Sequence, residues 1–160
     1  MQKIIPTLRL KNQRISLQKP IVMGILNVTP DSFYEESRIK DDSAILKKAS
    51  QMLEEGATIL DIGGYSTRPN ADDISIEEEI NRVIPSIHSI KKEFSNAIIS
   101  IDTFRSKVAR EAVNAGADLI NDVSGGNLDS QMFETVASLK VPYVLMHMRG
   151  TPQKFSILLK

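Results

Sequence analysis

The feature of this sequence that most constrains its fold is a strict alternation of short apolar runs with longer amphipathic stretches. After a polar N-terminal stretch, apolar runs rich in β-branched residues lie at 21–26, 58–62, 97–101, 118–120 and 143–146. Such runs are typical of strands buried on both faces. Between them, apolar residues recur with the helical period of about 3.6 residues. Because parallel strands need a crossover connection, the alternation predicts one parallel sheet with right-handed crossovers.

The helical stretches carry their own start and stop signals. The first is expected to begin at Asp42 or Ser43 and to end at Gly56. A capping box of Ser75 and Glu78 opens the second. The last helix covers roughly residues 129–139, and the residues expected to face the core are Met132, Phe133, Val136 and Ala137.

Polar residues follow the strands at their carboxyl ends, where barrels and doubly wound sheets both place ligands. An open dinucleotide-binding sheet would show a Gly-rich turn after its first strand, whereas here that strand runs into Asn27-Val28-Thr29-Pro30-Asp31. The sequence therefore favours an α/β fold of the (β/α)₈ TIM-barrel type. A complete barrel has roughly 250 residues and eight strands. The expectation for residues 1–160 is one partial barrel domain with about the first five strands and without the C-terminal ones.

Composition argues against several classes of function. Lys plus Arg and Asp plus Glu both number 20, so no net field attracts nucleic acid or an anionic membrane. The chain has no cysteine, which leaves no disulfide framework and no thiolate metal site. No apolar run approaches the roughly 20 residues of a membrane-spanning helix, and no apolar signal core follows Met1. A cytoplasmic protein without nucleic-acid or membrane partners is expected.

Two strand-end residues are the main candidates for chemistry. Asn27 follows the first strand, and its amide oxygen would suit a hard cation such as Mg²⁺; alternatively it closes a turn before Thr29. Asp102 follows a wholly apolar strand and would accept paired hydrogen bonds from the N–H edge of a guanidine-like heterocycle. Its alternative role is to cap the next helix. Spacing alone leaves both pairs of alternatives open.

Further candidates lie at the ends of the other strands, among them Asp61. Asn121 offers a donor and an acceptor to the same kind of heterocycle, whereas Asp122 could pair with a neighbouring backbone amide. Arg68 lies in a polar loop and is suited to clamp a phosphate, although most loop arginines are simply solvated. His147 is either a ligand or proton carrier, or a hydrogen-bonded structural residue.

Five collinear segments resemble the signature motifs of the dihydropteroate synthase family. They read MGILNVTPDSF at 23–33, DIGGYSTRP at 61–69, SIDT at 100–103, INDVSGG at 120–126 and MHMRGTP at 146–152. Together they span roughly residues 20–152, and their shared order is more specific than any one segment. The resemblance implies the pterin-binding barrel of that family.

The same resemblance implies a transferase of folate biosynthesis and a target of sulfonamides. Such an enzyme joins p-aminobenzoate to 6-hydroxymethyl-7,8-dihydropterin diphosphate, releases diphosphate, uses Mg²⁺ and forms a homodimer. The substrate-binding residues implied are Asn27, Phe33, Thr67, Arg68, Pro69, Asp102, Asn121 and Met146. Within this set, Arg68, Asp102 and Asn121 would be catalytic and Asn27 would contact the metal.

Several features depart from the family pattern. The later pterin-binding Asp and Lys, and the basic Arg and His near the family's C-terminus, have no counterparts in these 160 residues, and the tail 154–160 is atypical. Little or no synthase activity is therefore expected from the chain alone. One alternative is the pterin-binding domain of a methyltetrahydrofolate methyltransferase, which the NVTPDSF loop disfavours. The other is a non-catalytic half-barrel that binds a pterin weakly or self-associates through its open sheet edges.

Overall fold

A computed structural model describes residues 5–10, 13–28, 38–66 and 73–147. Its centre is a parallel sheet in the order β3-β4-β5-β6-β7. The strands are β3 (Met23–Asn27), β4 (Ile59–Gly63), β5 (Ile98–Asp102), β6 (Leu119–Asp122) and β7 (Tyr143–Leu145), and the helices are α1 (Arg38–Glu54), α2 (Ile76–Glu93), α3 (Ser106–Ala115) and α4 (Met132–Leu139). All five predicted strands are confirmed, with ends shifted by one or two residues.

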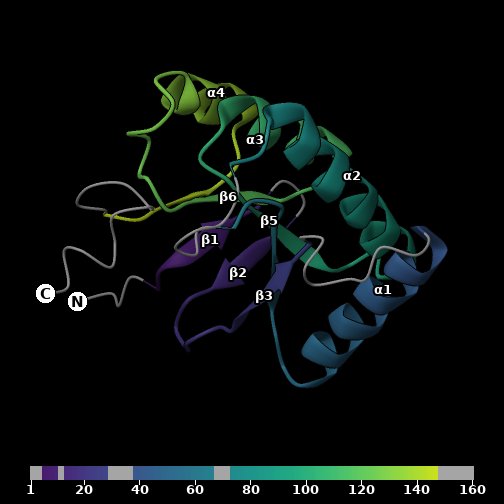
Figure 1. Ribbon diagram of the computed structural model, residues 1–160. Coiled ribbons are helices and arrows are strands. Elements are labelled where there is room, and N and C mark those ends of the chain that lie inside the picture. The colour runs from purple at the N-terminus through teal and green to yellow at the C-terminus, as the bar shows by residue number, and fades with distance from the viewer. Residues whose placement is uncertain (1–4, 11–12, 29–37, 67–72, 148–160) are drawn as a thin grey trace, which may run out of the picture.

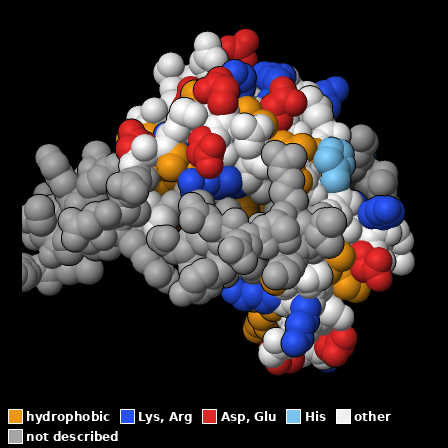
Figure 2. Space-filling view, turned by 45° about the vertical axis from the view of Figure 1, so that its right-hand side comes forward, with side chains coloured by type: hydrophobic (Ala, Val, Ile, Leu, Met, Phe, Trp, Pro, Cys, Tyr) orange, Lys and Arg blue, Asp and Glu red, His pale blue; other side chains and the backbone are white. Residues whose placement is uncertain are grey.

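The helices follow one another in chain order along one face of the sheet (Figure 1). A doubly wound sheet would reverse its strand order and carry helices on both faces, whereas here consecutive strands are neighbours throughout. The arrangement is therefore part of a (β/α) barrel, as predicted. Figure 2 shows basic and acidic side chains interspersed over the face in view, without a large patch of one sign.

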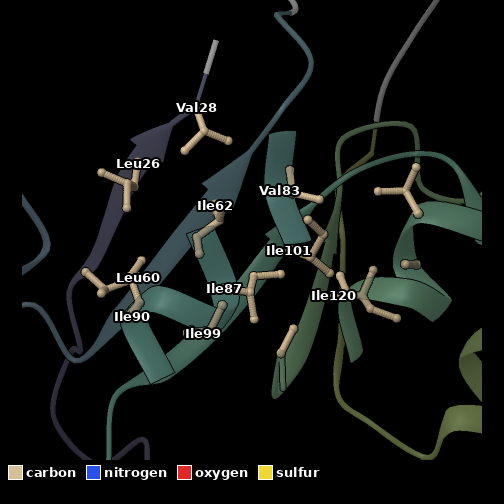
Figure 3. Packing of buried hydrophobic residues seen from close by; sticks show 14 of the residues in the cluster. Leu26, Val28, Leu60, Ile62, Val83, Ile87, Ile90, Ile99, Ile101 and Ile120 are labelled. Carbon is tan, nitrogen blue, oxygen red and sulfur yellow. The ribbon is translucent and has the colours of Figure 1, made fainter. Parts of the chain in front are cut away.

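The main core lies between the sheet and the helices. Leu60, Ile99 and Ile101 from the strands are fully buried against helix residues such as Val83 and Ile87 (Figure 3). Successive strand residues point to opposite faces, so every second strand residue enters this core and the intervening ones face away from the helices. The predicted apolar stripes of α1, α2 and α3 all contribute to it.

An antiparallel hairpin of β1 (Thr7–Arg9) and β2 (Arg14–Ser16) occupies the N-terminal stretch, where the sequence indicated only polar residues. Strands of three residues are too short to show a clear alternation. The hairpin sits at the amino ends of the parallel strands, where Leu10 packs into a second buried cluster. The other buried members of that cluster are Ile59, Ile98 and Leu119.

Two helix predictions need correction. Helix α1 begins at Arg38 instead of Asp42 or Ser43. Helix α4 begins at Met132, whereas the predicted start was near residue 129. The Ser75 cap of α2 is confirmed, since its hydroxyl accepts a hydrogen bond from the Glu78 amide at 3.0 Å.

The core-facing set predicted for α4 was also wrong in part. Met132 is fully buried and Val136 packs against the core, but Phe133 is 54% exposed and Ala137 is exposed. Thr135 is buried in their place. The stripe therefore follows the i, i+3, i+4 spacing from Met132, which puts Phe133 at its margin.

Candidate functional site

The strand register gathers four predicted strand ends into one row. Asn27 pairs with Gly63, Gly63 with Asp102, and Asp102 with Asn121. Residues beside them in each strand belong to the helix-facing core, so the row lies on the opposite face of the sheet. In a barrel that face is the interior, and the carboxyl ends of its strands carry the site.

Gly63 leaves a gap in the middle of this row. A Cβ atom placed on Gly63 would lie 3.4 Å from Asn27 Oδ1 and 3.5 Å from Asp102 Oδ2. Both oxygens therefore border the space that a side chain would fill. An amide oxygen and a carboxylate oxygen beside one open position suit a cation or a ligand rich in N–H groups.

Asp61 orients Asn121 from one layer deeper in the sheet. Its Oδ2 accepts a hydrogen bond of 2.9 Å from Asn121 Nδ2. Asn121 Oδ1 is then left to act as an acceptor at the carboxyl ends of the strands, which we call the mouth. Burial raises the pKa of Asp61, whereas Ser100 and Asn121 oppose that rise. The Ser100 hydroxyl lies on the register partner of Asp61 but outside hydrogen-bond geometry, so both it and Asp61 Oδ1 are buried without a partner among the described residues.

Asp102 contributes the carboxyl group of the row, and its pKa is strongly raised. Burial first, and then the negative charges of Asp61, Glu79 and Asp122, raise its pKa to about 7. Three acidic neighbours and a shielded position both disfavour the ionised form. The group can therefore gain or lose a proton near neutral pH, and a cationic ligand would hold it ionised.

Asp102 is not the cap of the helix that follows it. The N-terminal residue of α3, Ser106, donates its amide to Asp129 Oδ2 at 2.7 Å. That alternative role for Asp102 was therefore wrong, and Asp129, expected to begin α4, instead accepts hydrogen bonds from the amides of Ser106 and Gln131. The carboxylate of Asp102 remains available to the mouth.

A buried ion pair supports the loop after β5. Glu79, fully buried on α2, accepts hydrogen bonds from the Thr103 hydroxyl at 2.7 Å and from Arg105 Nη1 at 2.9 Å. Arg105 Nη2 also donates to the Ile74 carbonyl at 2.7 Å. The guanidinium lies 5.1 Å from the centre of the Tyr65 ring, within range of a cation–π contact. These contacts fix the residues after Asp102 against the start of α2.

Sequence reasoning missed Glu79 and Arg105. The signal for Glu79 was present, because it lies on the apolar stripe of its helix, three residues after Ile76 and four before Val83. A charged residue at such a position needs a buried partner. Nothing local indicated that this partner is Arg105, which lies 26 residues further along the chain.

Three of the remaining candidates lie in the described part of the chain, and four lie outside it. Asp122 is fully buried and accepts hydrogen bonds from the amides of Ser124 and Gly126, so the backbone-pairing alternative is confirmed. Met146 and His147 are exposed beyond β7. Four predicted site residues lie outside the described part of the chain, namely Phe33, Thr67, Arg68 and Pro69.

The described residues contain no group of three or more His, Cys, Asp or Glu side chains placed to hold a metal ion. No helix among them is both long and apolar enough to cross a membrane.

Comparisons with known proteins agree with this geometry. The profile of the pterin binding enzyme family matches residues 23–158. The folic acid synthesis protein fol1 of Schizosaccharomyces pombe is 52% identical over 138 residues, which cover 86% of this chain and 19% of that protein. The dihydropteroate synthase of Haemophilus influenzae is 44% identical over 142 residues, or 89% of this chain and 51% of that enzyme.

A solved structure shows the same relation. The dihydropteroate synthase of Xanthomonas albilineans with 4-aminobenzoic acid superposes with a TM-score of 0.84 at 44% identity, covering 92% of this chain and 53% of that one. The chain thus spans about half the length of the bacterial synthases that it matches. Its sequence motifs, its sheet and its row of polar strand ends all agree: the chain belongs to the family of pterin-binding enzymes, and the members it resembles here are dihydropteroate synthases.

Proposed function

We propose that this chain forms the pterin-binding side of a dihydropteroate synthase, a transferase of folate biosynthesis. The observation that carries the proposal is the row of Asn27, Asp102 and Asn121 around the gap at Gly63. The family's reaction breaks the C–O bond between a pterin methylene group and diphosphate. It forms a C–N bond to the amine of p-aminobenzoate and releases one proton from that amine.

Asp102 and Asn121 would hold the pterin. A pterin presents a planar edge of N–H donors and ring acceptors, and a carboxylate beside an amide oxygen suits such an edge. The high pKa of Asp102 falls when a positive charge approaches. Asp102 would therefore stabilise a pterin that becomes cationic as the C–O bond breaks, while Asp61 keeps the Asn121 amide in one orientation.

Asn27 would hold Mg²⁺ at the other side of the gap. Mg²⁺ takes oxygen ligands and keeps several waters, so one amide oxygen together with a substrate phosphate is a sufficient protein contribution. The position of Asn27 Oδ1 beside Gly63 fits that requirement. When bound, the ion would neutralise charge on the leaving diphosphate.

The remaining site residues complete the proposal. Arg68, with Thr67, Pro69 and Phe33, would bind the diphosphate and shape the p-aminobenzoate site, and Met146 would pack against the pterin. We also propose a cytoplasmic, homodimeric enzyme that uses only small-molecule substrates. The five strands provide one side of a barrel mouth, so full activity would require further strands to close it.

The test uses the purified chain with Mg²⁺ and compares Asp102→Ala with Glu134→Ala, which removes an exposed carboxylate on α4. Affinity for pteroic acid should fall about 100-fold in the first variant, from the loss of a charge-assisted contact, and stay unchanged in the second. Dihydropteroate formation is measured in parallel. Binding that depends on Asp102 without turnover would support the site and show that catalysis needs more strands. Equal affinity in wild type and Asp102→Ala would refute the proposal.

A further inference from the structure

The carboxylate of Asp122 accepts three hydrogen bonds on the helix-facing side of the sheet. Oδ1 accepts from the Ser124 amide at 2.7 Å, and Oδ2 accepts from the Gly126 amide at 2.9 Å and from the Tyr143 hydroxyl at 2.6 Å. Asp122 is fully buried. Because it points away from the face that carries Asn121, it cannot contact a ligand there. Its partners instead tie the turn after β6 to strand β7.

The turn after β6 is pressed closely against the end of β7. Gly125 and Gly126 have φ angles of 58° and 81°, a conformation that favours glycine. A Cβ atom on Gly125 would lie 2.5 Å from the Met146 carbonyl oxygen. The Asp122 carbonyl accepts from the amides of both Gly125, at 3.1 Å, and Met146, at 3.2 Å. The turn and Met146 therefore share one backbone acceptor and cannot shift independently.

Tyr143 supplies the side-chain link in this arrangement. Its hydroxyl reaches from β7 to Asp122 across the strand pair. Burial, followed by the hydrogen bond to Asp122 and the charge of that group, raises the pKa of Tyr143. The phenol therefore remains protonated at neutral pH and donates a charge-assisted hydrogen bond, the stronger kind. Its ring packs edge-to-face on Phe133 of α4, with ring centres 6.1 Å apart.

We propose that Tyr143 is a positioning residue for the pterin site. Its hydroxyl, through Asp122, sets the position of Met146 relative to Asn121. Val144 is the register partner of Asn121, so Met146, two residues later, lies on the same face one layer further out. Strand β7 has only three residues, and its ladder ends at Leu145. The Tyr143–Asp122 hydrogen bond therefore stabilises the two strands close to the position at which their backbone pairing ends.

The role in pterin binding rests on the proposed function, whereas the effect on Met146 does not. The variant Tyr143→Phe removes the hydroxyl and keeps the ring. Ser138→Ala is the matched control, because it also removes one hydroxyl, which donates to the Thr135 carbonyl within α4 at 2.8 Å, and it leaves Tyr143 and Asp122 in place. Hydrogen exchange of the Met146 amide is measured in the free full chain. Affinities for pteroic acid and for inorganic diphosphate with Mg²⁺ are then measured by titration at a temperature at which all three proteins are folded.

In Tyr143→Phe, the Met146 amide should exchange about tenfold faster, and pteroic acid should bind about 3- to 30-fold more weakly. Diphosphate affinity should not change, and Ser138→Ala should match the wild type in all three measurements. Unchanged exchange at Met146 in Tyr143→Phe would overturn the positioning role, whatever the ligand results. Faster exchange with unchanged pteroic acid affinity would overturn its link to the pterin site. A wild-type chain that binds no pteroic acid would refute the proposed function alone, because exchange still decides the role of Tyr143.

Discussion

The two ends of the parallel sheet differ in character, although the same strands form both: the amino ends are apolar and the carboxyl ends carry polar groups. At the amino ends, Ile59, Ile98 and Leu119 form an apolar floor that Leu10 of the hairpin region helps to close. At the carboxyl ends, the same three strands carry Gly63, Asp102 and Asn121 in a polar row. The floor contributes burial and therefore stability. The mouth concentrates carboxyl groups whose raised pKa values show that their ionised forms are disfavoured.

The floor therefore stabilises the fold, and the mouth carries the groups of the proposed binding site, a division common among barrels. The buried pair of Glu79 and Arg105 is an exception, because it lies near the mouth and yet supports the fold. Single substitutions at the two ends of the sheet test this division.

Arg105→Ala should be the most destabilising substitution near the mouth. Among the described residues, the buried Glu79 carboxylate would keep the Thr103 hydroxyl as its hydrogen-bond donor and lose its cationic partner. Such a loss costs about 3–5 kcal/mol. Urea unfolding followed by circular dichroism measures the change. The control is Lys107→Ala, which breaks an exposed pair with Glu77 and should leave the unfolding midpoint nearly unchanged, because solvent screens such a pair. Equal effects of the two variants would show that the buried pair has no special role.

Ile59→Ala should weaken the floor and leave the mouth unchanged. Ile59 is buried, so the loss of its side chain should lower the free energy of unfolding by about 3 kcal/mol. Ile59 lies four residues before Gly63 in β4, roughly 13 Å along the strand. Affinity for pteroic acid, titrated well below the melting temperature, should therefore stay within about twofold of wild type, because substitutions at distant sites usually act independently. A large loss of affinity in this variant would mean that the two ends of the sheet are coupled.

Asp102→Asn should act in the reverse direction, stabilising the fold while weakening pterin binding. In the unfolded chain Asp102 ionises near its ordinary pKa of 3.8, but in the fold only near 7. Between these values the folded state binds more protons, so the free energy of unfolding falls as pH rises, and above about 7 the loss is complete. The variant removes this loss and should gain about 1–3 kcal/mol at pH 8.

The pH dependence supplies the control for this variant. At about pH 2.5, below the ordinary pKa of 3.8, the Asp102 carboxyl is protonated in both the folded and the unfolded state. Wild type and Asp102→Asn should therefore unfold at nearly the same urea concentration there. A stability difference that is independent of pH would contradict the raised pKa. Burial also raises the pKa of Asp61 and of Glu79, so some decline with pH should persist in the variant.

Gly63→Ala should have the smallest effect on stability. Its Cβ would make ordinary contacts of 3.4–3.6 Å with Asn27 and Asp102. Replacing glycine restricts the unfolded chain and can stabilise by up to about 1 kcal/mol. The methyl group would nevertheless occupy the gap of the proposed site, so titration with diphosphate and Mg²⁺ should show weaker binding. Unchanged binding would place the metal and the diphosphate elsewhere.

Local patterns predicted most of the fold and the candidate row, and their failures are instructive. The buried runs and helical stripes located all five parallel strands and the helices between them, and strand ends supplied Asn27, Asp102 and Asn121. The hairpin at 7–16 was not predicted, because its strands have only three residues each and show no clear alternation. Phe133 was assigned to the core because one periodic stripe admits several phases. The tertiary contact with Tyr143 places its ring at the margin instead.

The order of the elements, the parallel sheet and the end of the sheet at which the polar groups meet could all be predicted from local patterns, because periodicity and alternation are local properties of the chain. Which of those groups act on one another depends on the folded arrangement. The hydrogen bond from Asn121 to Asp61 joins residues 60 positions apart, and the bond from Arg105 to Glu79 joins residues 26 apart. The raised pKa of Asp102 likewise depends on burial and on charges from other elements. Such properties depend on distances through space, which no local pattern specifies.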